Sequence, residues 1–281
     1  MFKNYNLNTK ISRVFVYIFL FILLIITLLP IWLLIVNATR STSQIQQGIG
    51  FIPSTHMLEN YQILANRGMN LPRGFMNSLF ISLSTTFLTV YFAFLAAYGI
   101  VVFNFPWKKA FSAFIVILLL IPMQLSIIGF FQYMSRLGLT DNYIPLILPS
   151  IASAVAVFFG VQYLESIVIK DLVDAGRVDG ASEIGIFHRI MMPIAMPGAV
   201  TLAIFTFVAS WNNFFTPFIM ISSIEKYTLP MLIQLLRGDV YRTEYGAIYL
   251  GLAITAIPVI IIYAFFSKYI ISGIAMGSVK E

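Results

Sequence analysis

Six long stretches of this sequence contain no charged side chain, and they limit the possible folds more than any other feature. A charge at the centre of a bilayer costs roughly 2.5–3.5 kcal/mol, and about 20 helical residues cross a hydrocarbon core of roughly 30 Å. Each stretch can therefore hold one membrane helix, which predicts an all-α membrane protein with six transmembrane helices. The stretches are 14–39, 74–107, 110–135, 142–164, 190–224 and 245–267, with helices expected near 14–36, 75–102, 111–131, 143–164, 196–220 and 245–268.

Composition excludes several kinds of chemistry. Of the 281 residues, 10% are charged and 59% are apolar, whereas soluble domains are about 25% charged. The chain has no cysteine, which excludes disulfides, thiolate metal sites and cysteine nucleophiles. His56 and His188 are isolated, and no Gly-Lys dipeptide marks a phosphate-binding loop. We therefore expect no metal site and no catalytic activity in this chain.

The distribution of Lys and Arg predicts the orientation in the membrane. With the N-terminus inside, the inner segments hold ten of these residues and the outer segments hold seven. This bias favours both termini in the cytoplasm. The net charge of +6 is then explained by membrane topology, and a nucleic-acid partner is not expected. The apolar stretch Val14–Val36 exceeds the 7–15 residues typical of a signal-peptide core, so we interpret it as an uncleaved first span.

The predicted spans also contain uncharged polar residues and prolines. Polar groups at membrane depth are tolerated only against protein or a watery cavity. They indicate either a solute pathway or hydrogen bonds and kinks that serve helix packing. The Trp and Tyr residues could equally belong to the membrane interfaces. Our candidate pathway residues are Tyr91, Tyr98, Gln124, Trp211, Asn212 and Asn213.

The inner loop 165–192 holds eight of the 28 charged residues. We predict a helix from about Ser166 to Val178 that ends at Gly180, because glycine readily takes the left-handed conformation after a helix. A second short helix is expected to begin near Ala181 or Ser182 and to stop before Pro193. Its apolar face would contain Ile184, Phe187 and Met191. The expected result is a helix–turn–helix projection from the bilayer.

This loop resembles the Glu-Ala-Ala…Gly loop of ABC importer permeases. The similar residues are Asp174-Ala175-Gly176, Asp179-Gly180-Ala181-Ser182, Phe187 and Pro193. Three other segments are similar to the carbohydrate branch, specifically the six-span, maltose-type second permease subunit: Asn77-Ser78-Leu79, Ser210-Trp211-Asn212 and the tail 273–280. Two positions depart from the family pattern, since Asp174 replaces Glu and Gly176 replaces the second Ala. Gly weakens a helix by about 1 kcal/mol relative to Ala.

The resemblance implies an ABC type I importer transmembrane fold and a role as one permease subunit of an ATP-driven sugar importer. It also implies a second, homologous permease subunit, two cytoplasmic ATPase subunits and an extracytoplasmic sugar-binding protein. This chain would bind no cofactor, because ATP and Mg would be held by the ATPases. The residues expected to couple to the ATPase are Asp174, Ala175, Gly176, Asp179, Gly180, Ala181, Phe187 and Pro193.

The same resemblance suggests how the chain divides into parts. We expect an N-terminal part at 1–72, a permease core at 73–271 and a cytoplasmic tail at 272–281, in a bacterial or archaeal cell membrane. The outer loop 221–243 resembles the loop that reaches the sugar-binding protein, although a simple helix connector fits it as well. No Lys or Arg lies in the spans, which favours a neutral saccharide. A non-sugar solute remains an alternative, and an autonomous secondary transporter is disfavoured because the spans hold no ionisable group.

Overall fold

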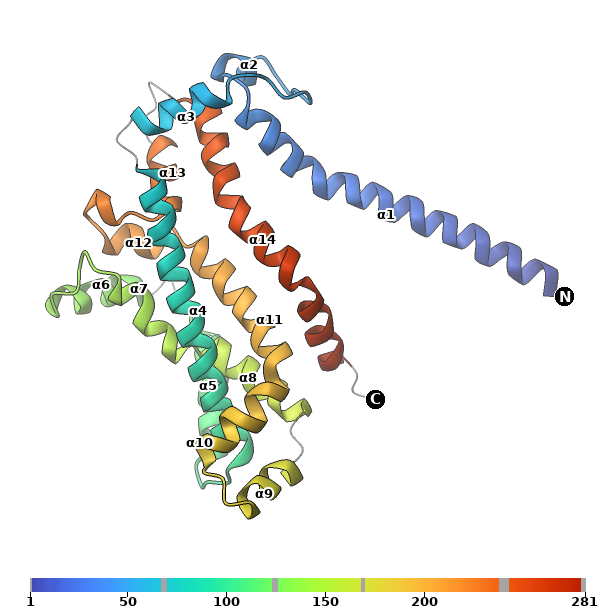
Figure 1. Ribbon diagram of the computed structural model, residues 1–281, viewed down its shortest axis with the longest axis vertical. Coiled ribbons are helices and arrows are strands. Elements are labelled where there is room, and N and C mark those ends of the chain that lie inside the picture. Colours follow the sequence, from blue (N-terminus) through green and yellow to red (C-terminus); the bar gives the residue numbers. More distant parts are fainter. Residues whose placement is uncertain (1, 67–69, 123–125, 168–169, 238–242, 279–281) are drawn as a thin grey trace. The chain divides into compact units, whose positions relative to one another are not determined.

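A computed structural model of the chain describes residues 2–66, 70–122, 126–167, 170–237 and 243–278. Every regular element in these ranges is helical, which confirms the predicted fold class (Figure 1). The helices are α1 (Phe2–Ala38), α2 (Thr42–Gln46), α3 (Met57–Asn66), α4 (Leu71–Val102), α5 (Lys108–Leu119), α6 (Ile127–Arg136), α7 (Ile144–Ile147), η2 (Leu148–Ala152), α8 (Ala154–Ile167), α9 (Lys170–Val178), α10 (Glu183–Ile186), η3 (Phe187–Met191), α11 (Met192–Trp211), α12 (Phe215–Met220), η4 (Ile224–Lys226), α13 (Leu229–Arg237) and α14 (Tyr245–Ser278).

Within the described residues, five helical stretches are long and apolar enough to cross a membrane: Ser12–Ala38, Leu71–Val102, Ile144–Ile167, Glu183–Trp211 and Tyr245–Phe266. They correspond to five of the six predicted spans. Ser12–Ala38 has none of its most apolar window buried, so its side chains are available to lipid or to another chain. The stretch that corresponds to the fifth predicted span begins at Glu183 and not near 196, because the helix of the inner loop continues into the membrane.

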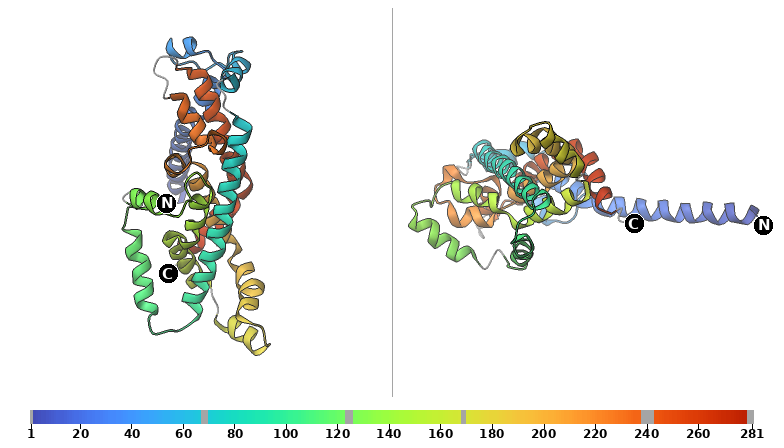
Figure 2. Two further views of the ribbon diagram at one scale, coloured as in Figure 1. Left: turned by 90° about the vertical axis from the view of Figure 1, so that its left-hand side faces the viewer. Right: turned by 90° about the horizontal axis from the view of Figure 1, so that it is seen from below.

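The third predicted span, 111–131, is not one continuous helix. It is divided between α5 and α6, which point in clearly different directions (Figure 2, left panel). At 12 residues, α5 is about 18 Å long, which is shorter than the bilayer core. The described chain leaves helical geometry at Ile121 and Pro122. Proline has no backbone N–H and its ring clashes with the preceding turn, so a break is favoured there.

The fourth span is also irregular. It combines α7, the 3₁₀ segment η2 and α8, with Pro145 and Pro149 each near the start of a short helix. The chain is extended at Ser153, between η2 and α8. Irregular backbone at this depth needs protein or water as a partner. Thr89 of α4 supplies one contact, since its hydroxyl donates to the Ser150 carbonyl at 3.2 Å.

The chain divides into two compact units. In the larger unit, residues 70–232 and 257–281, α4 packs against both α11 and α8 (Figure 1). Gly160 and Gly198 allow close approach: a Cβ on Gly160 would lie 3.0 Å from the Cβ of Ala97, and one on Gly198 would lie 2.5 Å from the Tyr163 ring. The central buried side chains include Phe94, Leu164, Ile186, Phe187 and Leu202.

In the smaller unit, residues 1–69 and 233–256, polar contacts join the ends of several helices. The Asn60 amide donates to the carbonyls of Ala38 and Arg40 at 2.9 and 3.0 Å. The Thr42 hydroxyl donates to the Glu244 carboxylate at 2.8 Å. These bonds join the end of α1 to α3 and α2 to the start of α14, and thereby order the connection that follows the first span.

Candidate functional site

The segment 170–193 forms the predicted helix–turn–helix. α9 ends in a Schellman motif: Gly180 has φ +78°, its N–H bonds to the Arg177 carbonyl at 3.0 Å, and the Ala181 N–H bonds to the Gly176 carbonyl at 3.0 Å. This geometry confirms the predicted role of Gly180 in the turn. The Ser182 side chain then caps α10 by accepting from the Gly185 N–H at 3.2 Å.

The expected stop before Pro193 is wrong. α10 continues through the π-helical turn η3 into α11, and Pro193 lies in the first turn of α11. Pro193 directly follows the π turn, in which the Met192 N–H bonds to the Phe187 carbonyl five residues back, and π turns accommodate an extra residue within a continuous helix. The inner segment is therefore attached directly to the fifth span by helical backbone.

A polar network ties this segment to α4. Arg177 of α9 pairs with Asp174 at 3.0 Å and with Glu183 at 2.7 Å. The second oxygen of Glu183 accepts from the Tyr98 hydroxyl at 2.8 Å. The hydrogen bond to Glu183 is the main cause that raises the pKa of Arg177 above its ordinary value, and the negative charges of Glu183 and Asp174 act in the same direction. The Arg177 guanidinium also lies over the Phe103 ring, 5.6 Å from its centroid.

The predicted coupling residues differ in exposure. Phe187 is only 1% exposed, with its ring 5.6 Å from that of Tyr98 and 6.1 Å from that of Tyr91. Gly176 is also buried, against Ile186 and Ile190. Phe187 and Gly176 therefore serve the fold of the segment. The exposed members are Asp174, Ala175, Asp179, Gly180, Ala181 and Pro193.

The predicted apolar face is partly wrong. Ile184 is 58% exposed, whereas Ile186, Phe187 and Met191 are buried. Ile186 takes the buried position because it packs against Gly176 of α9, where a Cβ would lie 3.1 Å from the Ile186 side chain. Phe187 and Met191 were expected on this face, and both lie there.

The five candidate pathway residues that the structure describes do not gather at one place. Tyr91 and Tyr98 contact the inner segment: the hydroxyl of Tyr91 lies 3.2 Å from Nε2 of His188, and that of Tyr98 donates to Glu183. Trp211 is 1% exposed and packs against Phe75 and Phe207. Gln124 lies outside the described residues.

Asn212 and Asn213 are exposed but bond locally. The Asn212 amide donates to the Val208 carbonyl at 3.0 Å, and the Asn213 side chain accepts from the Thr216 N–H at 3.2 Å. Both residues therefore shape the break between α11 and α12. Their predicted contact with a solute stays a prediction.

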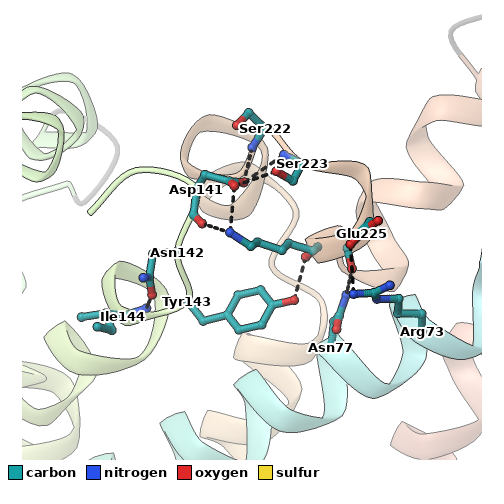
Figure 3. Close-up of polar contacts among 10 residues, drawn as sticks. Arg73, Asn77, Asp141, Asn142, Tyr143, Ile144, Ser222, Ser223 and Glu225 are labelled. Carbon is teal, nitrogen blue, oxygen red and sulfur yellow. Dashed lines mark hydrogen bonds and ion pairs between the residues drawn. The ribbon is translucent and has the colours of Figure 1, made fainter. Parts of the chain in front are cut away.

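Sequence reasoning missed a second polar cluster around Asp141, near the opposite end of α4 (Figure 3). One carboxylate oxygen of Asp141 accepts from the backbone N–H groups of Ser222 and Ser223 at 3.1 and 2.9 Å. The other oxygen accepts from the Ser223 hydroxyl at 2.7 Å and from the Lys226 ammonium at 2.8 Å. The bond from Lys226, followed by those from Ser223, lowers the pKa of Asp141 well below its usual range. Asp141 also has φ +55°.

The loop 222–227, which supplies the partners of Asp141, also contacts α4. The Asn77 amide donates to the carbonyls of Glu225 and Tyr227, both at 3.0 Å, and Arg73 pairs with Glu225 at 3.2 Å (Figure 3). Asn77 and Tyr98 are 21 residues apart on one helix, which corresponds to about 32 Å. The two polar clusters are thus separated by roughly the thickness of a bilayer core. The region 221–243 also contains the helix α13, whose Leu229, Met231 and Leu232 are buried.

Comparison with known proteins identifies the family. Residues 89–275 match the family described as "Binding-protein-dependent transport system inner membrane component". The chain belongs to this family. The arabinooligosaccharides transport system permease AraQ of Bacillus subtilis is 34% identical to this permease over 96% of this chain and 97% of its own length. The trehalose/maltose transport system permease MalG of Thermococcus litoralis is 28% identical over 96% of this chain and 98% of its own length.

Other relatives of the permease are named for the transport of diacetylchitobiose, lactose and sn-glycerol 3-phosphate, with 26–27% identity. A solved structure of a bacterial ABC transporter that imports the acidic polysaccharide alginate shares the fold. Its TM-score is 0.80 with 21% sequence identity, over 93% of this permease and 97% of that chain. The likeness confirms the ABC importer fold, and the family places the chain in the inner membrane as a multi-pass transport component.

Proposed function

We propose that this permease is one of two membrane subunits of an ATP-driven sugar importer. The observation that carries the proposal is the segment 170–193, which presents an exposed turn at Gly180 while its buried face is attached to α4 and to the fifth span. A force applied to such a turn passes directly to two membrane helices. The names of the relatives, most of them permeases for oligosaccharides or disaccharides, support a saccharide as the solute.

The proposed assembly contains four further proteins. A second, homologous permease completes the pathway as a heterodimer, and an extracytoplasmic protein delivers the saccharide. Two cytoplasmic ATPase subunits bind ATP and Mg, so this chain needs no cofactor of its own. The proposed orientation places both termini and the segment 170–193 in the cytoplasm of a bacterium or archaeon. It is supported by the excess of Lys and Arg in the predicted inner segments.

The ATPase would contact the exposed side of the segment. Asp174, Ala175, Asp179, Gly180 and Ala181 are exposed around the turn. Gly176 and Phe187 would act indirectly, because their burial sets the position of α9 on α10 and of α10 on α4. The shorter side chain of Asp174 is already held by Arg177, which keeps the carboxylate at a fixed place beside the turn.

A pair of matched glycine variants tests the proposal. Gly138 closes α6 with the same motif as Gly180: φ is +68°, its N–H bonds to Ser135 at 3.0 Å, and the Leu139 N–H bonds to Met134 at 2.9 Å. A Cβ at either glycine would meet no atom within 4 Å. Gly180→Val and Gly138→Val therefore impose similar backbone strain, about 1–2 kcal/mol for a left-handed residue, without a clash at Cβ.

Each variant is co-expressed with the partner permease, the ATPases and the binding protein. Pull-down of the ATPase and saccharide uptake in proteoliposomes are then measured. We expect Gly180→Val to lose most ATPase association and uptake, while Gly138→Val retains both. Equal behaviour of the two variants would refute the coupling role, because strain alone would then account for the effect. Gly180→Ala, with a smaller side chain, should fall between Gly180→Val and the wild type.

A charged solute is the second candidate, since one relative is named as a glycerol-3-phosphate permease. The predicted spans hold no Lys or Arg to pair with a phosphate. Uptake assays with an arabino-oligosaccharide, maltose, lactose, diacetylchitobiose and glycerol 3-phosphate would separate the two classes. Uptake of the phosphate ester alone would replace the sugar proposal.

A further inference from the structure

The loop between α2 and α3 carries three large apolar side chains that the fold leaves exposed. Ile49 is 78% exposed, Phe51 56% and Ile52 82%. The loop lies in the smaller unit and belongs to the stretch 41–58, which contains no Asp, Glu, Lys or Arg. Neighbouring apolar side chains on a protein surface mark a contact with another protein or with a membrane. These three residues therefore need a partner outside the chain.

Polar groups at the end of α1 hold the backbone of this loop in place. The Thr39 hydroxyl oxygen accepts from the Ser54 N–H at 2.8 Å, and the Arg40 guanidinium donates to the Gly48 carbonyl at 3.1 Å. Arg40 also packs on Gly50, where a Cβ would lie 2.7 Å from the guanidinium. The backbone of the loop is thus bonded to the protein, while its apolar side chains are left exposed.

Trp32 of α1 fixes how far the loop reaches back along the first span. Its indole N–H donates to the Phe51 carbonyl at 3.0 Å, and the loop lies near the end of α1 (Figure 1). Trp32 is six residues before Ala38, which corresponds to about 9 Å along the helix. The apolar stretch Ser12–Ala38 has 27 residues, so it is about 40 Å long and extends about 5 Å beyond each side of a core of roughly 30 Å. Trp32 and the backbone of Phe51 therefore lie near the boundary between hydrocarbon and headgroups, where Trp is enriched.

We infer that the loop 48–53 inserts Ile49, Phe51 and Ile52 into the headgroup boundary of the lipid bilayer and anchors the end of α1 there. Lipid is the partner that continues from the neighbouring span, because the most apolar window of Ser12–Ala38 has no buried residue. The stretch carries no charge whose burial would oppose insertion. The bonds to Trp32 and Arg40 also satisfy loop carbonyls that would otherwise enter the boundary unpaired.

The absence of cysteine from the chain allows single labels to be placed on the loop. Ile49→Cys and Ile52→Cys are each labelled with a nitroxide in the complete transporter, in vesicles of phosphatidylethanolamine and phosphatidylglycerol. The wild-type complex, labelled in parallel, corrects for cysteines of the other subunits. Electron paramagnetic resonance measures how often the label collides with oxygen, which concentrates in lipid, and with a water-soluble nickel chelate. The matched control is Glu59→Cys on α3, an exposed charged position of the same unit.

We expect both loop labels to collide more often with oxygen than with the nickel chelate, and the control label to show the reverse. The control pattern at either loop position would mean that the loop lies in water and would overturn the insertion. Protection from both reagents would mean that a protein covers the loop, and it would overturn the insertion equally.

A second measurement tests the depth of the loop. A fluorophore on Ile52→Cys is quenched by lipids that carry a nitroxide either near the headgroup or near the end of the acyl chain. We expect stronger quenching by the shallow nitroxide, and equal or stronger quenching by the deep one would refute the position at the boundary. None of these outcomes depends on the transported solute, so failure here leaves the proposed function untouched.

Discussion

The hydrogen bond between Tyr98 and Glu183 is the most direct link between the inner segment and α4, and its strength can be measured. The hydroxyl–carboxylate distance is 2.8 Å, and Tyr98 is 3% exposed. A hydrogen bond to a charged group contributes about 1.5–3 kcal/mol. Because the Glu183 side chain is 40% exposed, solvent screening reduces this to about 1–1.5 kcal/mol, which is roughly a tenfold change in the local equilibrium.

A double-mutant cycle with Tyr98→Phe and Glu183→Gln isolates this interaction. Unfolding is followed by far-ultraviolet circular dichroism during titration of mixed micelles with SDS. Glu183→Gln also weakens the pair with Arg177, so the single variants differ, but the coupling energy contains only the bond to Tyr98. The control cycle replaces Tyr98→Phe by Tyr133→Phe, which alters an exposed tyrosine on α6. We expect coupling of about 1 kcal/mol in the first cycle and none in the control. A value under about 0.3 kcal/mol would refute the interpretation that this bond holds the segment on α4.

Two further predictions concern stability. Asp141 has a lowered pKa in the folded protein, mainly because of the hydrogen bond from Lys226 and next because of those from Ser223. The ionised carboxylate therefore stabilises the folded state fully above about pH 4, and this contribution is lost as the pH falls below that value. The apparent melting temperature of Asp141→Asn should thus fall less steeply than that of the wild type between pH 6 and pH 3, and parallel curves would contradict the role of this carboxylate. Gly198→Ala places a Cβ 2.5 Å from the Tyr163 ring and should destabilise the protein by about 1–3 kcal/mol in the SDS titration. An unchanged midpoint would mean that the ring moves freely.

Much of the fold could be predicted from local sequence alone. A charge-free run and a glycine after a helix are signals that act over a few residues, so the long α4 and the left-handed Gly180 both agree with expectation. The break in the third predicted span had its signal at Pro122, but the sequence did not show that α5 and α6 would be separate helices. The start of the fifth predicted span at Glu183 was missed for a related reason, since Pro193 could either end a helix or begin one.

The site depended on contacts between distant parts of the chain. Asp141 and Lys226 are 85 residues apart, and nothing in either neighbourhood indicates the other. Tyr98 was singled out as a candidate pathway residue, but its hydrogen bond to Glu183 of the inner segment could not be foreseen from the sequence. The sequence by itself determined which segments enter the membrane, because the cost of burying a charge is paid residue by residue. The tertiary structure decided which polar groups meet, because hydrogen bonding requires specific atoms within about 3 Å and that geometry exists only after the helices pack.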